Sequence, residues 1–183
     1  MNLYRVFPSD PRARADEPGG PLWWPRFHQG SGRHDNPLEY ACIYASESAV
    51  GAAAEVLAVF RGRGILEPWM LITPEGRLTI AELALDDDPG LVDLDRPRVL
   101  AEERLRPSHV ATHDREITQA YAAKLHERHS SAVGLRWWST LESLWANVTL
   151  FDRAKPRLVG APRGLTVEDP VVVEAADFLG LAA

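Results

Sequence analysis

Two parts of the chain have the apolar pattern of β-strands. The stretch YACIYA, residues 40–45, predicts a short buried strand, because successive side chains of a strand point to opposite faces. One face of this strand would carry Tyr40, Cys42 and Tyr44. Farther along, EPWMLITPEGRLTI, residues 67–80, predicts two strands joined by a turn at Pro74, Glu75 and Gly76.

Two other segments have the period of a helix. The run AVGAAAEVLAVF, residues 49–60, predicts a largely buried helix, and Ser46 and Ser48 before it are candidate N-caps. Between residues 114 and 127 apolar side chains recur at every fourth position. This spacing predicts an amphipathic helix whose buried face carries Ile117, Tyr121 and Leu125.

The remaining segments are less regular. Residues 8–37 are rich in proline and glycine, which predicts a loop region held onto the body by Trp23, Trp24 and Phe27. The acidic, proline-containing residues 86–98 predict another loop. Residues 134–151 mix strand-favouring aromatics with a middle that fits a loop or a helix. Residues 169–183 fit a terminal helix, or a strand followed by a helix.

Composition narrows the class of protein. A chain of 183 residues with 45% hydrophobic content is in the usual range of one globular domain. The formal net charge of −6 disfavours direct nucleic-acid binding, and any phosphate affinity must come from a few arginines. Cys42 is the sole cysteine, and neither a leader sequence nor an apolar stretch of membrane-spanning length is recognisable. We therefore expect a cytoplasmic protein without membrane contact.

Glu55 is the first candidate for chemistry. It is the only ionisable residue in the predicted helix 49–60. A carboxylate among apolar side chains loses hydration, so it must find a donor, bind a ligand or shift its pKa, and such groups are frequent at functional sites. A structural ion pair with Arg61 or a more distant arginine is an equally good interpretation of this feature alone.

Arg33 lies in GSGRHDNP, where small residues precede it and an Asn-Pro turn follows. Its guanidinium offers a planar set of donors suited to phosphate oxygens, although an arginine in such a loop is usually a solvated surface residue. The histidine pairs 109/113 and 126/129 lack a third ligand at a suitable spacing, so no metal site is expected. Neither a Walker-type loop nor a GxSxG motif is present.

The order of these motifs resembles that of the RES-domain family. Arg33 lies in a GR-x-x-N loop, Tyr44 follows in IYAS, and Glu55 follows in an alanine-rich helix, with ten residues between each pair. Tyr4-Arg5-Val6 resembles the family's N-terminal strand, and residues 134–151 carry the matching Ser139, followed by Asn147. The resemblance covers residues 4–152. It implies a single α+β domain over residues 1–183, similar to ADP-ribosyltransferases, with mixed sheets, flanking helices and a C-terminal extension at 153–183.

Characterised RES proteins are bacterial toxins that destroy NAD by phosphorolysis or hydrolysis, and a helix-turn-helix antitoxin holds them inactive. The resemblance therefore implies cleavage of the nicotinamide–ribose bond, with Arg33, Tyr44 and Glu55 as catalytic residues. Glu55 would stabilise the positive charge that develops on the ribose. Tyr44 would contact nicotinamide or ribose, and Arg33, with Arg5 as a second candidate, would bind pyrophosphate or inorganic phosphate. Ser139 and Asn147 would complete the phosphate pocket, although an ordinary turn after Trp138 explains both residues without the family.

NAD would be a substrate, with inorganic phosphate as a candidate co-substrate, and no cofactor is implied. An Xre-type antitoxin is the expected partner, and a homodimer remains open. Two residues depart from the family pattern, since His34 replaces a common aromatic residue and Asp35 adds a negative charge beside the proposed phosphate site. A non-catalytic nucleotide- or partner-binding module, or transfer of ADP-ribose to a macromolecule, are the alternatives.

Overall fold

The computed structural model describes residues 1–86 and 90–182 and divides into two compact units. The Arg33 unit consists of Met1, Trp24–Tyr44 and Leu85–Lys155. The Glu55 unit consists of Asn2–Trp23, Ala45–Ala84 and Pro156–Ala183. Strand β2 (Cys42–Ser46) contributes its first three residues to the Arg33 unit and its last two to the Glu55 unit.

The Arg33 unit contains three further strands. β6 (Gly134–Trp138) pairs antiparallel with β7 (Ala146–Phe151), and Trp137 lies opposite Asn147 in this register. β5 (Leu91–Asp93) pairs with the other side of β6 in parallel. All six residues of β7 are buried, as expected for a strand covered on both faces. Parallel and antiparallel neighbours thus occur in one mixed sheet.

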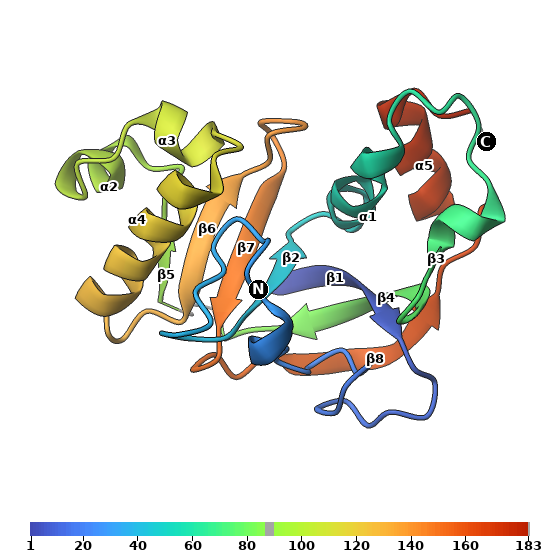
Figure 1. Cartoon of the computed structure of the whole chain (residues 1–183), viewed down its shortest axis with the longest axis horizontal. Helices are drawn as coiled ribbons and strands as arrows, with labels where there is room; N and C mark the ends of the chain where they lie inside the picture. Colours follow the sequence, from blue (N-terminus) through green and yellow to red (C-terminus); the bar gives the residue numbers. More distant parts are fainter. Residues whose placement is uncertain (87–89, 183) are drawn as a thin grey trace. The chain divides into compact units, whose positions relative to one another are not determined.

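Helices of the Arg33 unit lie beside this sheet (Figure 1). They are α2 (Pro97–Glu102), α3 (Pro107–Ala111) and α4 (Arg115–Arg128), and the unit also contains the 3₁₀ turn η1 (Arg26–His28). Asp114 caps α4 by accepting hydrogen bonds from the backbone N–H groups of its first turn. The buried face of α4 packs with side chains of β5, β6 and β7 into one core, which includes Tyr121, Leu125, Leu135, Trp137 and Phe151.

The Glu55 unit is built on a second group of strands. β1 (Asn2–Ser9) pairs along its whole length with the antiparallel β4 (Gly76–Ala84), and Tyr4 also pairs with Ser46 of β2. β3 (Ile72–Thr73) and β8 (Arg157–Gly164) pair with β4. Residues 3, 5 and 7 of β1 are buried and their neighbours are not, so alternation places Arg5 on the core face of the strand.

Two helices of this unit pack against each other, α1 (Ala49–Leu57) and α5 (Pro170–Leu179). Ser48 caps α1 by accepting from the Gly51 N–H, and Asp169 caps α5 in the same way from Val171. Two short 3₁₀ turns complete the unit, η2 (Ala58–Phe60) and η3 (Pro68–Leu71). Among the described residues, no helix is long and apolar enough to cross a membrane.

Most predicted elements are confirmed. The α+β class with a mixed sheet and flanking helices is correct, as are the helices near 49–60 and 114–127, the strand near residue 42 and the hairpin turn before Gly76. Residues 134–151 form the hairpin β6–β7, and the tail forms a helix. The C-terminal extension contains β8, which the sequence had not indicated.

Four details of the prediction are wrong. Phe27 does not hold the loop in place, because its side chain is 95% exposed, whereas Trp23 and Trp24 are half-buried. Ile117 is 38% exposed, because the buried stripe of α4 runs instead through Thr118, Tyr121, Ala122 and Leu125. Residues 68–71 form a 3₁₀ turn that starts at a proline, not a strand. The predicted acidic loop contains β5, and its residues 87–89 lie outside the described part of the chain.

Candidate functional site

Arg33 is a buried residue whose guanidinium binds backbone carbonyl groups. Its Nη1 donates to the carbonyl oxygens of Val110 (2.9 Å) and Thr112 (2.6 Å). Both carbonyls lie at the end of α3, where the last carbonyl groups of a helix lack partners within the helix. The guanidinium also lies 4.8 Å from the ring centroid of Trp137, a distance suited to a cation–π contact. The arginine therefore joins its loop to α3 and to the sheet.

His34 is completely buried, and both of its ring nitrogens are hydrogen-bonded. Nδ1 lies 2.8 Å from Thr149 Oγ1, and Nε2 lies 2.7 Å from Tyr121 Oη. Burial holds the pKa of the imidazole well below its usual value, and the positive charges of Arg33 and Arg115 lower it further. The ring is therefore neutral at physiological pH and joins the loop to β7 and α4.

Both carboxylate oxygens of Asp35 accept hydrogen bonds. Its Oδ2 accepts from the backbone N–H groups of Gly30 (2.8 Å) and Gly32 (2.7 Å), and its Oδ1 accepts from the Tyr44 hydroxyl (2.6 Å). The same hydroxyl accepts from the His34 N–H at 2.9 Å. Burial, followed by the nearby Cys42 and Asp35, raises the pKa of Tyr44 well above its usual value. Tyr44 is therefore a neutral phenol held in one orientation.

Close packing around this pair requires a glycine at position 32. A Cβ atom there would lie 2.5 Å from Asp35 Oδ1 and 2.5 Å from the Tyr44 hydroxyl. The glycine thus lets the loop backbone approach the carboxylate closely enough to donate to it.

The predicted common face of Tyr40, Cys42 and Tyr44 is confirmed by what these side chains contact. Each reaches the loop at residues 34–35, since Tyr40 Oη donates to the His34 carbonyl (2.6 Å) and Cys42 Sγ lies 3.5 Å from Asp35 Oδ1. Burial raises the pKa values of the Tyr40 hydroxyl and the Cys42 thiol far above their usual range. Both groups are therefore protonated, and the thiol is not a nucleophile at neutral pH.

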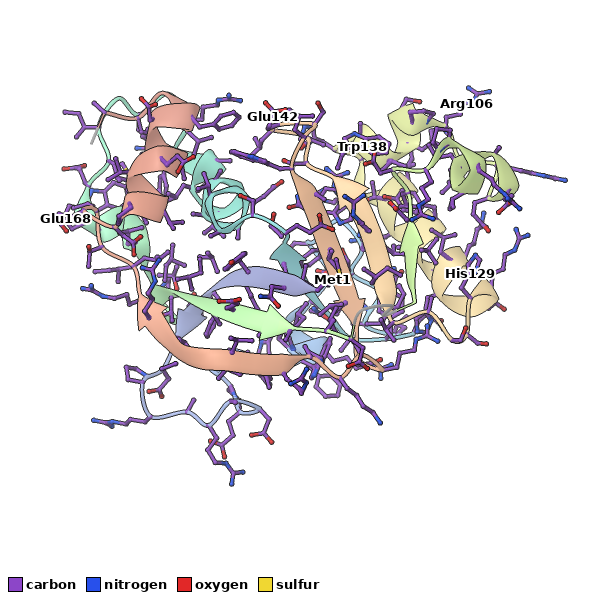
Figure 2. The ribbon with its side chains drawn as sticks, turned by 180° about the vertical axis from the view of Figure 1, so that it is seen from behind. Met1, Arg106, His129, Trp138, Glu142 and Glu168 are labelled. Carbon is purple, nitrogen blue, oxygen red and sulfur yellow. The ribbon has the colours of Figure 1, made fainter. Side chains whose placement is uncertain are left out.

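Ser139 and Asn147 are buried in the same unit. Ser139 directly follows Trp138, the last residue of β6, and the turn continues towards Glu142 (Figure 2). Its hydroxyl accepts from the Leu141 N–H at 3.0 Å, and its own N–H donates to the Trp145 carbonyl at 2.7 Å, which is the geometry of the ordinary turn. Asn147 lies opposite Trp137, the residue whose ring Arg33 contacts. Arg33, Tyr44, Ser139 and Asn147 thus all belong to the Arg33 unit.

Glu55 and Arg5 belong to the other unit. Glu55 is half-buried on α1, whose buried positions are Gly51 to Ala54 and Leu57. Arg5 is buried, and its Nη1 donates to the carbonyl oxygens of Pro21 (2.5 Å) and Trp23 (3.3 Å). Its guanidinium lies 5.2 Å from the ring centroid of Phe7. Arg5 therefore holds the proline-rich loop against β1.

Comparisons with known proteins agree with the order of the motifs. The family model described as RES domain matches residues 2–171. The chain belongs to the RES family. A crystal structure of the M. tuberculosis MbcT–MbcA toxin–antitoxin complex contains a chain with the same fold, with a TM-score of 0.66 and 17% sequence identity. This match covers 98% of the present chain and 87% of that chain. No curated protein matches the sequence.

Four buried residues of this RES chain were not predicted as members of the site. His34 and Asp35 were identified only as departures from the family, and Tyr121 and Thr149 were not considered. A signal was present for Tyr121, because a tyrosine on the buried face of a helix needs a partner for its hydroxyl. The sequence holds no sign that this partner would be a histidine 87 residues earlier.

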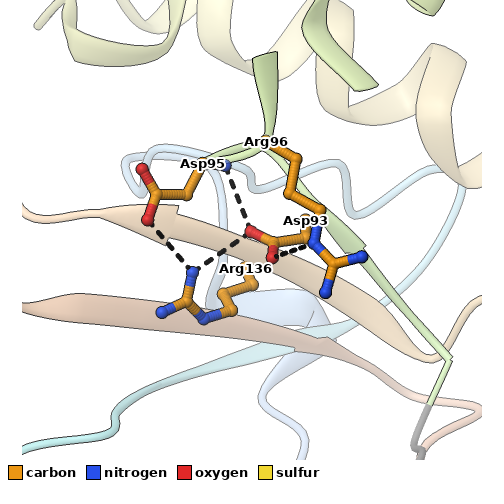
Figure 3. A network of polar contacts seen from close by, with 4 residues as sticks. All are labelled: Asp93, Asp95, Arg96 and Arg136. Carbon is orange, nitrogen blue, oxygen red and sulfur yellow. Dashed lines mark hydrogen bonds and ion pairs between the residues drawn. The ribbon is translucent and has the colours of Figure 1, made fainter. Parts of the chain in front are cut away.

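A hollow of about 510 Å³ occurs elsewhere in the Arg33 unit, and none of the predicted site residues lines it. Its wall includes β5, Arg136 of β6 and His129. His129, which is labelled in Figure 2, directly follows α4. Arg136 Nη1 lies 3.2 Å from Asp93 Oδ1 and 3.3 Å from Asp95 Oδ2, and Arg96 also pairs with Asp93 (Figure 3). In the described parts of the chain, no group of three or more His, Cys, Asp or Glu side chains is placed to hold a metal ion.

Proposed function

We propose that this RES protein cleaves the bond between nicotinamide and ribose in NAD. The observation that carries the proposal is the family match over residues 2–171, because RES proteins with known activity destroy NAD. Departure of neutral nicotinamide leaves a positively charged, oxocarbenium-like ribose, which a nearby carboxylate stabilises. Glu55 is our candidate for this carboxylate, since it is half-buried on an otherwise apolar helix.

Tyr44 is our candidate for contact with the nicotinamide or the ribose. Its hydroxyl already donates to Asp35 and accepts from the His34 N–H, so the ring has a fixed position before any ligand binds. Arg33 supports this arrangement by holding the loop to two carbonyl groups and the Trp137 ring. A side chain held in place in this way loses little entropy when substrate binds. Arg5, Ser139 and Asn147 stay predictions as substrate-binding residues.

The test is consumption of NAD by the purified protein and by the variant Glu55→Gln. The amide keeps the shape of the side chain and removes its charge, so we expect turnover to fall by about 10²–10³-fold or more while thermal stability is retained. Glu174→Gln is the matched control, because Glu174 is an exposed glutamate on the other helix of the same unit, α5. NAD left intact by the wild-type protein would refute the proposal, and full activity of Glu55→Gln would show that another carboxylate acts.

We further propose that the protein is a toxin with an antitoxin partner of the Xre helix-turn-helix type. The similar fold of the MbcT–MbcA toxin–antitoxin complex supports this assignment. Induced expression of the wild-type chain in bacteria should lower cellular NAD and stop growth, whereas Glu55→Gln should do neither. Co-expression of the protein encoded by the adjacent reading frame should restore growth. Unchanged NAD and normal growth after strong expression of the wild-type chain would contradict a toxic role.

A further inference from the structure

Strand β5 of the Arg33 unit has one edge without a neighbouring strand. It lies at the end of the strand order β7-β6-β5, and within the described residues it pairs with β6 alone. The Gly90 carbonyl and the Leu94 N–H, just before and after β5, bond to backbone groups of residues 133 and 136 at 3.1 Å and 2.8 Å. Since the backbone groups of successive residues point to opposite sides of a strand, Leu91 and Asp93 direct theirs to the free edge.

The hollow of about 510 Å³ lies along this free edge. Its lining includes Leu91 and Asp93, whose side chains share one face of β5. It also includes Val92, whose side chain lies on the opposite face and belongs to the core. A hollow that reaches both faces of a strand lies beside its edge and not over one face. Part of the lining beyond β5 comes from Val99 and Glu102 of α2.

The two least exposed carboxylates of the lining are matched within the chain. Asp93 pairs with Arg96 at 3.0 Å and with Arg136 at 3.2 Å (Figure 3). Glu103, directly after α2, lies 2.9 Å from His129 Nε2. A charged ligand would compete with these contacts, so an uncharged one fits better. The apolar part of the lining consists of Leu91, Val92, Val99 and Ala132.

The free edge offers hydrogen-bonding groups in the spacing of a backbone. They are the N–H and the carbonyl of Leu91 and the N–H of Asp93, and among the described residues none is bonded to another part of the chain. The Asp93 carbonyl is different, because it accepts from the Arg96 N–H at 3.3 Å. Pairing along this edge can therefore extend over Leu91 and end at Asp93. Donor, acceptor and donor in this order match the edge of another extended chain.

We propose that this hollow is a docking site for a short extended segment of a partner protein, which adds a strand to the free edge of β5. One residue of the segment exchanges two hydrogen bonds with Leu91, and a carbonyl two residues away accepts from the Asp93 N–H. Uncharged side chains of the segment contact Val99 and Ala132. The volume is within the range of about 300–1,000 Å³ typical of ligand sites, which suits a few residues and not a second folded sheet.

The first experiment selects the segment. Random heptapeptides displayed on phage are selected on the wild type and on Ser131→Trp, which adds a large side chain at an exposed residue of the lining. Ser108→Trp is the matched control, because Ser108 is an exposed serine of the same unit outside the lining. We expect a consensus rich in uncharged residues, with similar binding to wild type and Ser108→Trp and binding weaker by about tenfold or more to Ser131→Trp. Thermal unfolding checks that both variants fold.

The second experiment needs the wild-type protein alone. The capped consensus peptide is titrated into ¹⁵N-labelled protein, and amide hydrogen exchange is followed by NMR. We expect binding to slow exchange at Leu91 and Asp93. Peptides with one N-methylated residue test strand addition directly, since a strand bonds through alternate residues only. Methylation should weaken binding by about tenfold at alternate positions and by less than about twofold at the positions between them.

Each outcome supports or overturns the docking site. Failure to enrich any peptide would overturn it, and so would equal binding to Ser131→Trp and the wild type. Methylation effects without alternation would exclude strand addition. If light scattering shows a dimer whose formation protects Leu91 and Asp93, a second copy occupies the edge and the proposal is wrong. NAD turnover enters none of these measurements, so the docking site and the proposed enzymatic function stand or fail separately.

Discussion

Each unit of this protein contains one buried arginine that ties a loop to a sheet, and the surroundings of the two differ. Arg5 is held by two carbonyl oxygens and the Phe7 ring. Arg33 has the same kind of contacts, but its chain neighbours His34 and Asp35 extend them into a polar network that reaches Thr149, Tyr121 and Tyr44. An arginine predicted to bind phosphate can thus have a structural role instead, and Arg33 connects this role to Tyr44, a candidate substrate-binding side chain.

Replacement of either arginine should have the largest effect on stability. Arg33→Met and Arg5→Met keep much of the side-chain volume but leave two carbonyl groups without a donor, so each should lower the free energy of unfolding by about 3–4 kcal/mol. Urea denaturation measures both values. Arg33→Met should also displace Tyr44 and reduce NAD turnover, whereas Arg5→Met should affect turnover less. A loss below about 1 kcal/mol for either variant would disprove its structural role.

Gly32→Ala should have the next largest effect. The added methyl group would lie 2.5 Å from Asp35 Oδ1 and from the Tyr44 hydroxyl, so these buried groups must separate and weaken their hydrogen bond. We expect a loss of about 3 kcal/mol in urea denaturation. Gly164→Ala in β8 is the control, because its nearest contact is the mobile side-chain Cδ of Arg77 at 3.3 Å, and it should cost less than about 1 kcal/mol. Equal losses in the two variants would contradict the close packing of the Asp35 loop.

His34 should make the stability of the Arg33 unit depend on pH. Its pKa in the folded protein lies well below 6.5, so the unfolded chain binds a proton near pH 6 that the folded protein does not. The stabilisation is therefore complete above about pH 6.5 and is lost as pH falls towards the folded pKa, by up to about 1.4 kcal/mol per pH unit. Urea unfolding at several pH values should show a smaller dependence in His34→Gln. Replacement of the exposed His113 by glutamine is the control and should leave the pH dependence of the free energy of unfolding as in the wild type. The same pH dependence in His34→Gln as in the wild type would contradict the prediction.

Tyr121→Phe should have the smallest effect of the four. The variant removes the hydroxyl that lies 2.7 Å from His34 Nε2 and leaves the packing of the ring in place. Loss of one buried hydrogen bond should lower the free energy of unfolding by about 1–2 kcal/mol. Unchanged stability of Tyr121→Phe would show that the hydrogen bond between Tyr121 and His34 does not stabilise the protein. The midpoint of urea unfolding measures the difference.

Local patterns were sufficient to predict several elements and one shared face. Ser48 and Asp114 cap the helices that the periodicity predicted, because a capping side chain bonds to backbone within three residues of itself. Tyr40, Cys42 and Tyr44 share a face because a strand alternates whatever its neighbours are. The prediction of the buried residues of α4 was less accurate. Ile117 and Thr118 both fit the helical period, and only packing against the sheet selects Thr118 for burial.

Long-range contacts explain the elements and roles that local patterns missed. β5 is three residues long, and its parallel pairing with β6 joins residues more than 40 positions apart. Asp35 looked like a charge that would disturb a phosphate site, whereas it is the acceptor around which the loop folds. A hydrophobic pattern predicts which positions are buried. It does not predict which buried polar groups will form hydrogen bonds with one another.

From the amino-acid sequence alone we could predict the helices near residues 49–60 and 114–127, the strand near residue 42, the order of the RES motifs and the position of Glu55 among apolar residues. The elements and the surroundings of Glu55 depend on residues a few positions apart, and the order of the motifs is a property of the linear chain. The folded structure was needed to show that Arg33 binds the carbonyls of Val110 and Thr112, that His34 is neutral and that the Asp35 carboxylate accepts from its own loop. The partners of Arg33 are almost 80 residues away, and the charge state of His34 follows from a burial that exists only after the chain has folded.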